Sequence, residues 1–511
     1  MVALPQNAAG PAQRTSYAQI LRSSALIGGA SALNLAIGML RTKALAMLLG
    51  PAGIGLYGVF AAVTDLARSV AQLGINASGV RQIAEAVGSN DEHRIARTVT
   101  VLRRIAVALG LLGMASLIVL SRQVSQWTFG SEQHAAAIAW LSLAVFFRLV
   151  AEGQAALFQG MRRIVELAKI GVMGALAGAV VSVALAVLMG EAGVVPGLIA
   201  TAVLSTLISW WYARSIRVQP VRMSGLEVRE EAASLLKLGL AFMASGLLMT
   251  GAAFAVRAIV LRHSGVDAAG LYQAAWTLGG MYVGFVLQAM GTDFYPRLVG
   301  VIGDGAHANR IVNEQAQVSL LLAGPGVIAT LVFAAPVVTA FYSTEFTLAI
   351  DALRWICLGM ALRVVTWPIG YLIVAANHRL VFFATELAWT IVNVGLSWVC
   401  VTRYGLAGAG IAFFGSYVFH GFMVYAVVRH MHGFRWTAQT WQHGWIFVVS
   451  IGVVFVAFHS LPGAWALGAG ALFLLASAWR TASALVRMAP ELLPPGLRRV
   501  LARRHDVSTG V

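Results

Sequence analysis

Four arginines, Arg41, Arg148, Arg257 and Arg363, lie inside long apolar stretches of this sequence. A guanidinium group stays charged at physiological pH, and its planar fork of donors pairs bidentately with phosphate oxygens. An arginine at the centre of a lipid bilayer costs at least about 2.5 to 3.5 kcal/mol, so it normally faces water, a partner or a ligand. A cavity surrounded by these four side chains would attract anions, and we take all four as candidate substrate-binding residues.

Three acids, Asp65, Glu152 and Glu386, also lie within apolar stretches. Asp65 precedes Arg68 by three residues and Arg148 precedes Glu152 by four, so each pair shares one face of a helix. Two interpretations stay open. Each pair is an internal ion pair that allows the arginine to be buried, or the acids exchange a proton or bind a cation in ion-coupled transport. We therefore treat all three acids as ion-coupling candidates.

Aromatic residues and catalytic motifs add little chemistry. Trp367, one turn after Arg363, could stack on a sugar ring, although tryptophans of membrane proteins more often form interfacial belts.

The sequence contains no Walker lysine motif, GxSxG elbow or HExxH motif. Its two cysteines, Cys357 and Cys400, support neither a disulfide framework nor a thiolate metal site. We expect no catalytic residue, no metal site and no cofactor.

The composition indicates a membrane protein. Of the 511 residues, 59% are hydrophobic and 11% are charged, and the mean hydropathy is +0.79. Soluble domains carry about 25% charged residues. The net charge of +16 does not indicate nucleic-acid binding, because the basic residues punctuate the apolar runs instead of clustering on one soluble face.

The apolar runs have the length that an α-helix needs to cross a bilayer, roughly 20 residues or more. Only helices satisfy all their backbone hydrogen bonds in lipid, apart from closed barrels. We expect an all-α polytopic membrane protein with about fourteen transmembrane helices. We place them near 24–48, 53–75, 101–121, 136–159, 167–189, 194–213, 236–261, 269–292, 315–341, 348–375, 380–401, 405–428, 443–460 and 463–482.

The positive charges predict the orientation. Most of the 36 lysines and arginines fall at the N-terminus, in alternate linkers and in the C-terminal tail. The opposite set of linkers holds only Arg122, Arg262 and Arg403. Basic loops stay in the cytoplasm, so both termini are predicted to be cytoplasmic in a bacterial inner membrane.

Two parts of the chain resemble each other at a displacement of about 215 residues, which is typical of transporters built from repeats. Gly55-Leu56-Tyr57 recurs as Gly270-Leu271-Tyr272, Arg148 corresponds to Arg363, and Arg41 corresponds to Arg257. Six helices separate the equivalents, so the repeat is parallel and its pseudo-twofold axis lies along the membrane normal. Two six-helix lobes would then enclose a central cationic cavity. The predicted parts are an N-lobe (1–213), a cytoplasmic linker (214–235), a C-lobe (236–435), two further helices (436–485) and a basic cytoplasmic tail (486–511).

One segment carries a family resemblance. It comprises Leu40-Arg41-Thr42-Lys43-Ala44-Leu45, Leu49-Gly50-Pro51-Ala52-Gly53-Ile54-Gly55-Leu56-Tyr57-Gly58 and Leu73-Gly74-Ile75-Asn76-Ala77-Ser78-Gly79-Val80-Arg81. It resembles the Wzx-type flippases of O-antigen and exopolysaccharide synthesis, in the multidrug/oligosaccharidyl-lipid/polysaccharide exporter superfamily.

The resemblance implies a flippase that moves undecaprenyl-pyrophosphate-linked oligosaccharide from the cytoplasmic to the periplasmic leaflet by alternating access. Arg148 and Arg363 would hold the pyrophosphate, and Arg41 and Arg257 would line its outward path. The resemblance further implies a role in O-antigen, lipopolysaccharide or exopolysaccharide assembly. Membrane lipid, a polysaccharide polymerase and a chain-length regulator are the candidate partners.

Two alternatives stay open. A drug exporter of the same superfamily would have a related fold, but it usually binds cations, for which an acidic cavity suits better than arginines. A membrane-embedded glycan polymerase or ligase, which is an enzyme, commonly has a large outer loop for its chemistry. The outer loops predicted here are all short, which disfavours the enzyme.

Overall fold

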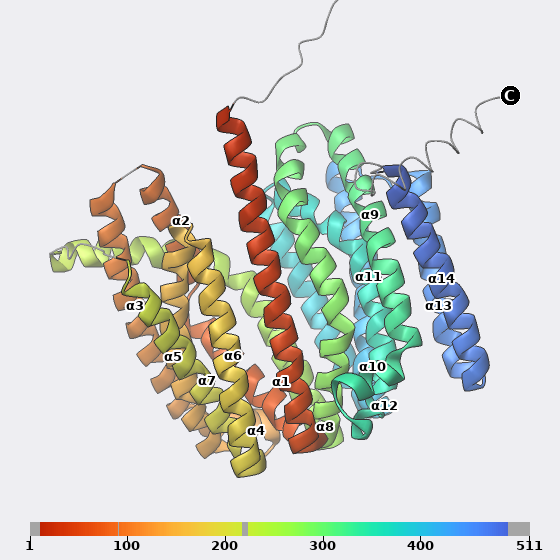
Figure 1. The fold of residues 1–511 in the computed structure, drawn as a ribbon, viewed down its shortest axis with the longest axis horizontal. Helices are drawn as coiled ribbons and strands as arrows, with labels where there is room; N and C mark the ends of the chain where they lie inside the picture. Colours follow the sequence, from red (N-terminus) through yellow and green to blue (C-terminus); the bar gives the residue numbers. More distant parts are fainter. Residues whose placement is uncertain (1–10, 90, 217–222, 489–511) are drawn as a thin grey trace, which may run out of the picture. The chain divides into compact units, whose positions relative to one another are not determined.

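The computed structural model describes residues 11–89, 91–216 and 223–488, and within these ranges the chain forms helices and no strand (Figure 1). The elements are α1 Pro11–Ala71, α2 Ile75–Gly88, α3 Glu92–Val119, α4 Ser121–Phe129, α5 Ala135–Gly160, α6 Ile164–Met189, the short 3-10 helix η1 Gly190–Gly193, α7 Val194–Ala213, α8 Gly225–Val301, α9 Gly305–Val332, α10 Ala334–Phe341, the 3-10 helix η2 Thr344–Phe346, α11 Ala349–Ala375, α12 Arg379–His432, α13 Ala438–Ser460 and α14 Gly463–Met488.

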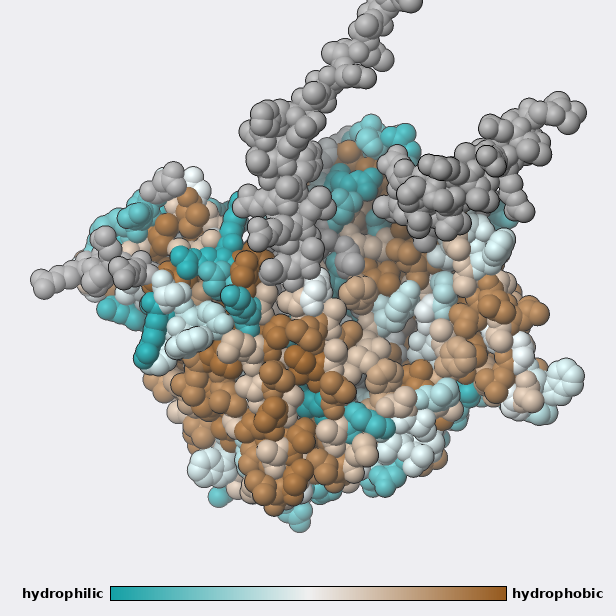
Figure 2. Space-filling view, in the orientation of Figure 1, coloured by the Kyte–Doolittle hydropathy of each residue, from teal (hydrophilic) through white to brown (hydrophobic). Residues whose placement is uncertain are grey.

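The helices are those of a multi-pass membrane protein. In the described ranges, nine helical segments are long and apolar enough to cross a membrane, each containing an apolar window of 18 residues. Large hydrophobic side chains such as Leu188 and Trp479 are exposed, and Figure 2 shows hydrophobic residues over much of the face in view. Soluble monomers rarely expose such extensive apolar surface, whereas lipid accommodates it.

Three of the longest helices each contain one break. The backbone leaves the helical region at Gly50 in α1, Gly265 in α8 and Gly405 in α12. Each break falls in or beside a gap between two predicted spans, as at Gly50 between 24–48 and 53–75. Gly50 has a φ of 62°, and Pro51, which follows it, disfavours the α conformation in the preceding residue. The count of fourteen spans depends on treating such breaks as span ends, and it stays a prediction.

The chain forms two compact units, which we describe separately. Unit 1 contains residues 1–271 and 341–345, and unit 2 contains residues 272–340 and 346–511. The division falls inside α8, a few residues after its break at Gly265. The lobe limits that the repeat predicts, with a linker at 214–235, stay a prediction.

The start of α8 is set by a capping box. The Ser224 backbone N–H donates to the Glu227 carboxylate at 2.8 Å, and the Glu227 N–H donates to the Ser224 hydroxyl at 3.3 Å. These reciprocal bonds satisfy backbone donors that a helix end leaves without partners. The hydrogen bond from the Ser224 backbone also holds the pKa of Glu227 below its ordinary value. The second part of the predicted linker is therefore ordered helix, while residues 217–222 lie outside the described ranges.

This first part of α8 packs on other helices within unit 1. The Thr98 hydroxyl donates to Glu231 at 2.6 Å, and the Gln82 amide donates to the Ser234 hydroxyl at 3.0 Å. Leu235 is fully buried in the apolar core that α2, α3 and α5 form. Apolar burial and polar contacts together hold α8 against α2 and α3.

A close backbone contact continues this attachment. The chain turns between α1 and α2 through Leu73 and Gly74, whose φ values are 47° and 70°. A Cβ atom at Gly74 would overlap the carbonyl oxygen of Gly239 in α8, and one at Gly239 would overlap the carbonyl oxygen of Leu73. Both positions therefore require glycine, Gly74 because of its left-handed φ as well.

In unit 2, α13 and α14 pack on α9 and on each other. Asn313 of α9 accepts from the Thr437 N–H at 2.9 Å and donates to the Arg435 carbonyl at 3.1 Å. The Gln317 amide donates to the Thr440 hydroxyl at 2.8 Å. Polar contacts therefore anchor the predicted additional helix pair at the start of α13. Most of the predicted basic tail, residues 489–511, lies outside the described ranges.

Two glycines of α8 provide a matched test of the close contact. We expect Gly239→Ala to lower the melting temperature in detergent by several degrees, because its Cβ overlaps the backbone of the α1–α2 turn. Gly251→Ala should leave it unchanged or raise it slightly, since a Cβ there meets no atom within 4 Å and alanine favours a helix by about 1 kcal/mol. Thermal unfolding followed by size-exclusion chromatography measures both, and equal melting temperatures for the two variants would contradict the contact.

Candidate functional site

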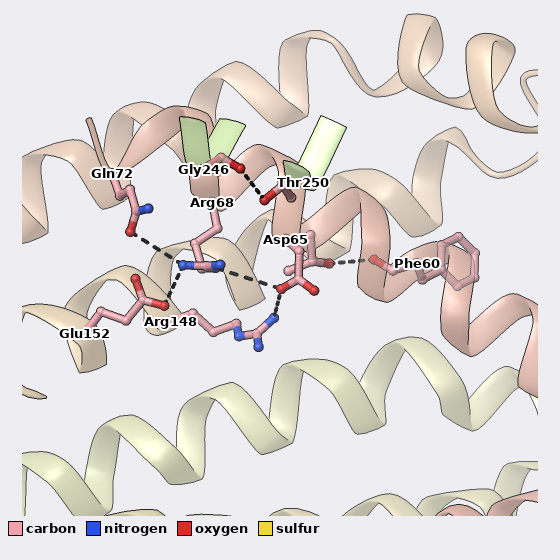
Figure 3. Close-up of polar contacts among 9 residues, drawn as sticks. Phe60, Asp65, Arg68, Gln72, Arg148, Glu152, Gly246 and Thr250 are labelled. Atoms are coloured by element: carbon pink, nitrogen blue, oxygen red, sulfur yellow. Dashed lines mark hydrogen bonds and ion pairs between the residues drawn. The ribbon is translucent and has the colours of Figure 1, made fainter. Parts of the chain in front are cut away.

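Four charged residues of unit 1, Asp65, Arg68, Arg148 and Glu152, meet in one network between α1 and α5 (Figure 3). The Arg148 Nη1 atom lies 2.7 Å from Asp65 Oδ1, and the Arg68 Nη1 atom lies 2.7 Å from Glu152 Oε1. A weaker contact of 3.8 Å joins Arg68 Nε to Asp65 Oδ1 within α1. The Arg68 Nη1 atom also lies 3.5 Å from Gln72 Oε1.

The strongest ion pairs join the two helices, whereas the spacing indicated pairs within each helix. Asp65 and Arg68 stand one turn apart on α1, and Arg148 and Glu152 stand one turn apart on α5. Because α1 and α5 pack together, the base of each helix reaches the acid of the other. The predicted pairing of Arg148 with Glu152 is thus replaced by a pair with Asp65, and the Asp65–Arg68 contact persists at the longer distance.

The network is electrically balanced. It contains two acids and two bases, whose side chains are between 21% and 42% exposed. An arginine between apolar helices is tolerated when an opposite charge compensates it. Arg148 is therefore already paired with a carboxylate in this structure. The sequence analysis, in contrast, expected its charge to be available to a pyrophosphate group.

A polar cavity adjoins the network. Its volume is about 510 Å³, and its lining comes from α1, α2, α5, α8 and the α1–α2 turn. The lining residues are Arg68, Ser69, Gln72, Gly74, Asn76, Ala77, Val80, Glu152, Gln159, Met243 and Gly246. The cavity belongs entirely to unit 1. Sequence analysis singled out Glu152 and the neighbouring ion pair but not the amide side chains.

The other two predicted arginines of unit 1 have protein partners. Arg41 donates to the Tyr57 hydroxyl, and its guanidinium lies 5.3 Å from the centre of the Tyr57 ring. The Arg257 Nη1 atom donates to the Ala253 carbonyl at 2.9 Å, one turn earlier in α8. Arg41 and Arg257 are therefore both engaged by other groups of the protein, and their role in substrate binding stays a prediction.

Unit 2 holds a second polar cluster between α11 and α12. Glu386 Oε1 lies 3.9 Å from His420 Nε2, and the His420 ring lies 5.7 Å from the Tyr417 ring. Arg363 is close enough to act electrostatically on Glu386, Tyr417 and His420. Among the residues that the structure describes, no carboxylate lies within 4.0 Å of the Arg363 guanidinium. Arg363 therefore differs from its repeat equivalent Arg148, which has a carboxylate partner.

Trp367 lies among aromatic residues. Its ring centre is 4.5 Å from that of Tyr371 and 5.8 Å from that of Phe294. It packs at the edge of an apolar core of unit 2, which is the ordinary role of a large aromatic side chain. Stacking of Trp367 on a sugar stays a prediction.

A family model described as polysaccharide biosynthesis protein matches residues 44–351, more than half of the 511 residues. The chain belongs to the polysaccharide biosynthesis protein family. The matched range includes both sides of the α1–α5 network and ends at the start of α11.

Relatives of this family member include the lipid III flippase of Escherichia coli (strain K12), with 21% identity over 411 residues that cover 78% of this chain and 95% of the relative. The solved structure of the lipid II flippase MurJ in an inward closed conformation has a TM-score of 0.65 at 13% identity, covering 90% of this chain and 99% of that one. An inward-facing multidrug resistance transporter of the MATE family, in the MOP superfamily, has a TM-score of 0.57 at 16% identity, covering 78% and 98%. The resemblance to exporters of this superfamily is confirmed, and the fold of the polysaccharide biosynthesis protein is that of MurJ and MATE transporters.

Several site residues of this family member were missed from the sequence. His420 stands far from Glu386 in the chain, and no short motif connects them. Gln72, Asn76 and Gln159 are uncharged, so their presence near apolar helices carries less insertion cost than that of an arginine. The α1–α2 turn separates Gln72 from Asn76, so no helical spacing connected these residues in the sequence.

The ion pair that joins Asp65 of α1 to Arg148 of α5 can be tested with a double-mutant cycle on these two residues. We expect a coupling of about 1 to 2 kcal/mol between Asp65→Ala and Arg148→Ala, because each single change leaves an uncompensated charge. The exposed pair of Asp293 and Arg297 in α8 is the matched control, with an expected coupling of about 0.5 kcal/mol or less. Unfolding titrations in mixed detergent measure both cycles, and equal couplings would refute the network.

Proposed function

We propose that this polysaccharide biosynthesis protein is a flippase for a polyprenyl-pyrophosphate-linked oligosaccharide. The match to a lipid III flippase along nearly the whole of that relative carries the proposal. Charged side chains that meet between apolar helices of unit 1 support it, because such groups in membrane proteins generally serve a pathway for polar substrates or ions. The substrate would be linked to undecaprenol and would serve O-antigen or exopolysaccharide assembly.

The pyrophosphate would contact Arg363 first. In the described chain this arginine has no carboxylate partner, so its charge is available to an anion. Arg41, whose partner is the uncharged Tyr57, would attract the same group, and Arg257 would line its outward path. Arg148 would participate only after exchanging Asp65 for phosphate oxygens, which are equally good acceptors for a guanidinium.

Alternating access would move the substrate between leaflets. We infer fourteen transmembrane helices in two lobes, with both termini in the cytoplasm and the chain in the inner membrane. Gly55 and Gly270, equivalent in the repeat, are in backbone contact within unit 1. Equivalent residues touch where a twofold axis passes between them, which supports the parallel repeat.

Glu386 is the strongest of the three acids for ion coupling. Asp65 and Glu152 each hold an arginine at 2.7 Å, whereas Glu386 has His420 at 3.9 Å. Both members of the Glu386–His420 pair can carry or release a proton. Proton exchange there would change the charge beside Arg363 and so alter the affinity of Arg363 for an anion.

The anion role of Arg363 is tested by measuring flipping in proteoliposomes with a defined lipid-linked oligosaccharide. We expect Arg363→Ala to lower the rate at least tenfold and Arg363→Lys to restore it only in part, because lysine lacks the bidentate fork. Arg403→Ala, a change at an exposed arginine of α12, should have wild-type activity.

Unchanged flipping by Arg363→Ala would overturn the assignment. Movement of a cationic drug instead of the lipid-linked sugar would favour a multidrug exporter. Covalent joining of glycans by the purified protein would favour a polymerase or ligase, and transfer without covalent change would exclude both enzymes.

The coupling role of Glu386 requires a separate measurement. We expect Glu386→Gln to make flipping insensitive to an imposed proton gradient, because the amide cannot exchange a proton, while slow flipping without a gradient persists. The matched control is Asp351→Asn at the start of α11, whose side chain is 65% exposed. A gradient dependence equal to that of the wild type would exclude Glu386 as the coupling residue.

A further inference from the structure

The cavity beside the charge network has a lining unlike that of an anion site. Its volume of about 510 Å³ lies within the range of small-molecule pockets, about 300 to 1,000 Å³. Among the described residues of its lining, Arg68 is the only one with a basic side chain. That arginine already bonds to Glu152 at 2.7 Å and lies beside Asp65, so its charge is compensated before any ligand binds.

Amide side chains supply most of the remaining hydrogen-bonding groups. Gln72, Asn76 and Gln159 line the cavity, and each amide offers two donors and an acceptor. Within the described chain, no hydrogen bond to another residue involves the Asn76 or Gln159 side chain. The Gln72 carbonyl accepts from Arg68 at 3.5 Å, which leaves its NH₂ group available.

Glu152 adds an unsatisfied acceptor. Its Oε1 atom accepts from Arg68, while Oε2 is buried and has no hydrogen-bond partner among the described residues. A buried carboxylate oxygen without a donor is costly. A ligand hydroxyl or amide N–H in the adjoining cavity would supply the missing donor after a small rotation of the carboxylate.

From these contacts we infer that the cavity between α1, α2, α5 and α8 is the sugar subsite, which takes a hexose unit through Gln72, Asn76, Gln159 and Glu152. Hydroxyl groups of a sugar both donate and accept, as this lining requires. The carboxylate of Glu152 would repel pyrophosphate. A prenyl chain would leave the amides without partners, and water alone would fill the cavity without distinguishing one lipid from another.

The inference rests on the proposed flippase function and assigns the sugar and the pyrophosphate to different residues. Arg363 would determine affinity for the pyrophosphate group. The amides of unit 1 would determine selectivity for the glycan. The two contributions are therefore separable in binding experiments on the same full-length protein.

The test compares undecaprenyl pyrophosphate with the same lipid bearing, in turn, a hexose, an N-acetylhexosamine or a hexuronic acid. Binding to the full-length protein in nanodiscs is measured by native mass spectrometry. We expect the wild type to bind at least one glycosylated lipid more tightly than the sugar-free lipid. Asn76→Leu and Gln159→Leu should each reduce that preference about tenfold and change affinity for the sugar-free lipid less than twofold.

Gln133→Leu, the same change at an exposed residue outside the cavity, should alter neither affinity. Arg363→Ala should weaken binding of all four lipids to a similar extent. Wild-type protein that binds every lipid equally would overturn the sugar subsite and leave the flippase proposal standing. Wild-type protein that binds none of them would overturn the flippase proposal and the subsite with it. Loss of sugar-free binding in Asn76→Leu or Gln159→Leu would also overturn the subsite, because it would show a general defect.

Discussion

The cost of placing charge between apolar helices governs the arrangement of this protein. Every ionised group there needs an opposite charge, water or a ligand. In unit 1 the requirement is met by two ion pairs that join α1 to α5, Arg148 with Asp65 and Arg68 with Glu152. Both pairs cross the interface between the two helices, and Arg68 and Glu152 also line the polar cavity beside it.

The two members of the repeat meet that requirement differently. Arg148 lies against a carboxylate, whereas Arg363 lies near Glu386 and His420 with no carboxylate within ion-pair distance in the described chain. The predicted repeat has an arginine at both positions, but the acids around the two arginines differ. Positions that are equivalent in the predicted repeat therefore do not have equivalent chemical surroundings.

The all-helical, multi-pass class was predictable because the apolar runs are long enough to cross a membrane as helices. The break at Gly50 was predictable from the Gly-Pro sequence and the gap between apolar runs. The ion-pair partners were not, because a spacing of three or four residues allows both pairing within a helix and pairing to a neighbour. Only the packing of α1 on α5 decides between them. His420 was missed for a similar reason. It lies far from Glu386 in the sequence, and only the folded structure of α12 shows that the two side chains are near each other.

A substrate with a charged group and a neutral glycan presents conflicting demands on a transporter. Strong ionic contacts favour capture but hinder release, and a ligand shifts a conformational equilibrium only through different affinities for the two states. Neutral hydrogen bonds contribute about 0.5 to 1.5 kcal/mol each, so in the proposed flippase an amide-lined cavity would add selectivity without trapping the glycan. The titratable pair beside Arg363 would allow the stronger ionic contact to be weakened when a proton leaves. Assigning selectivity to the amides around Asn76 and affinity to Arg363 would therefore let some residues discriminate between substrates while others control release.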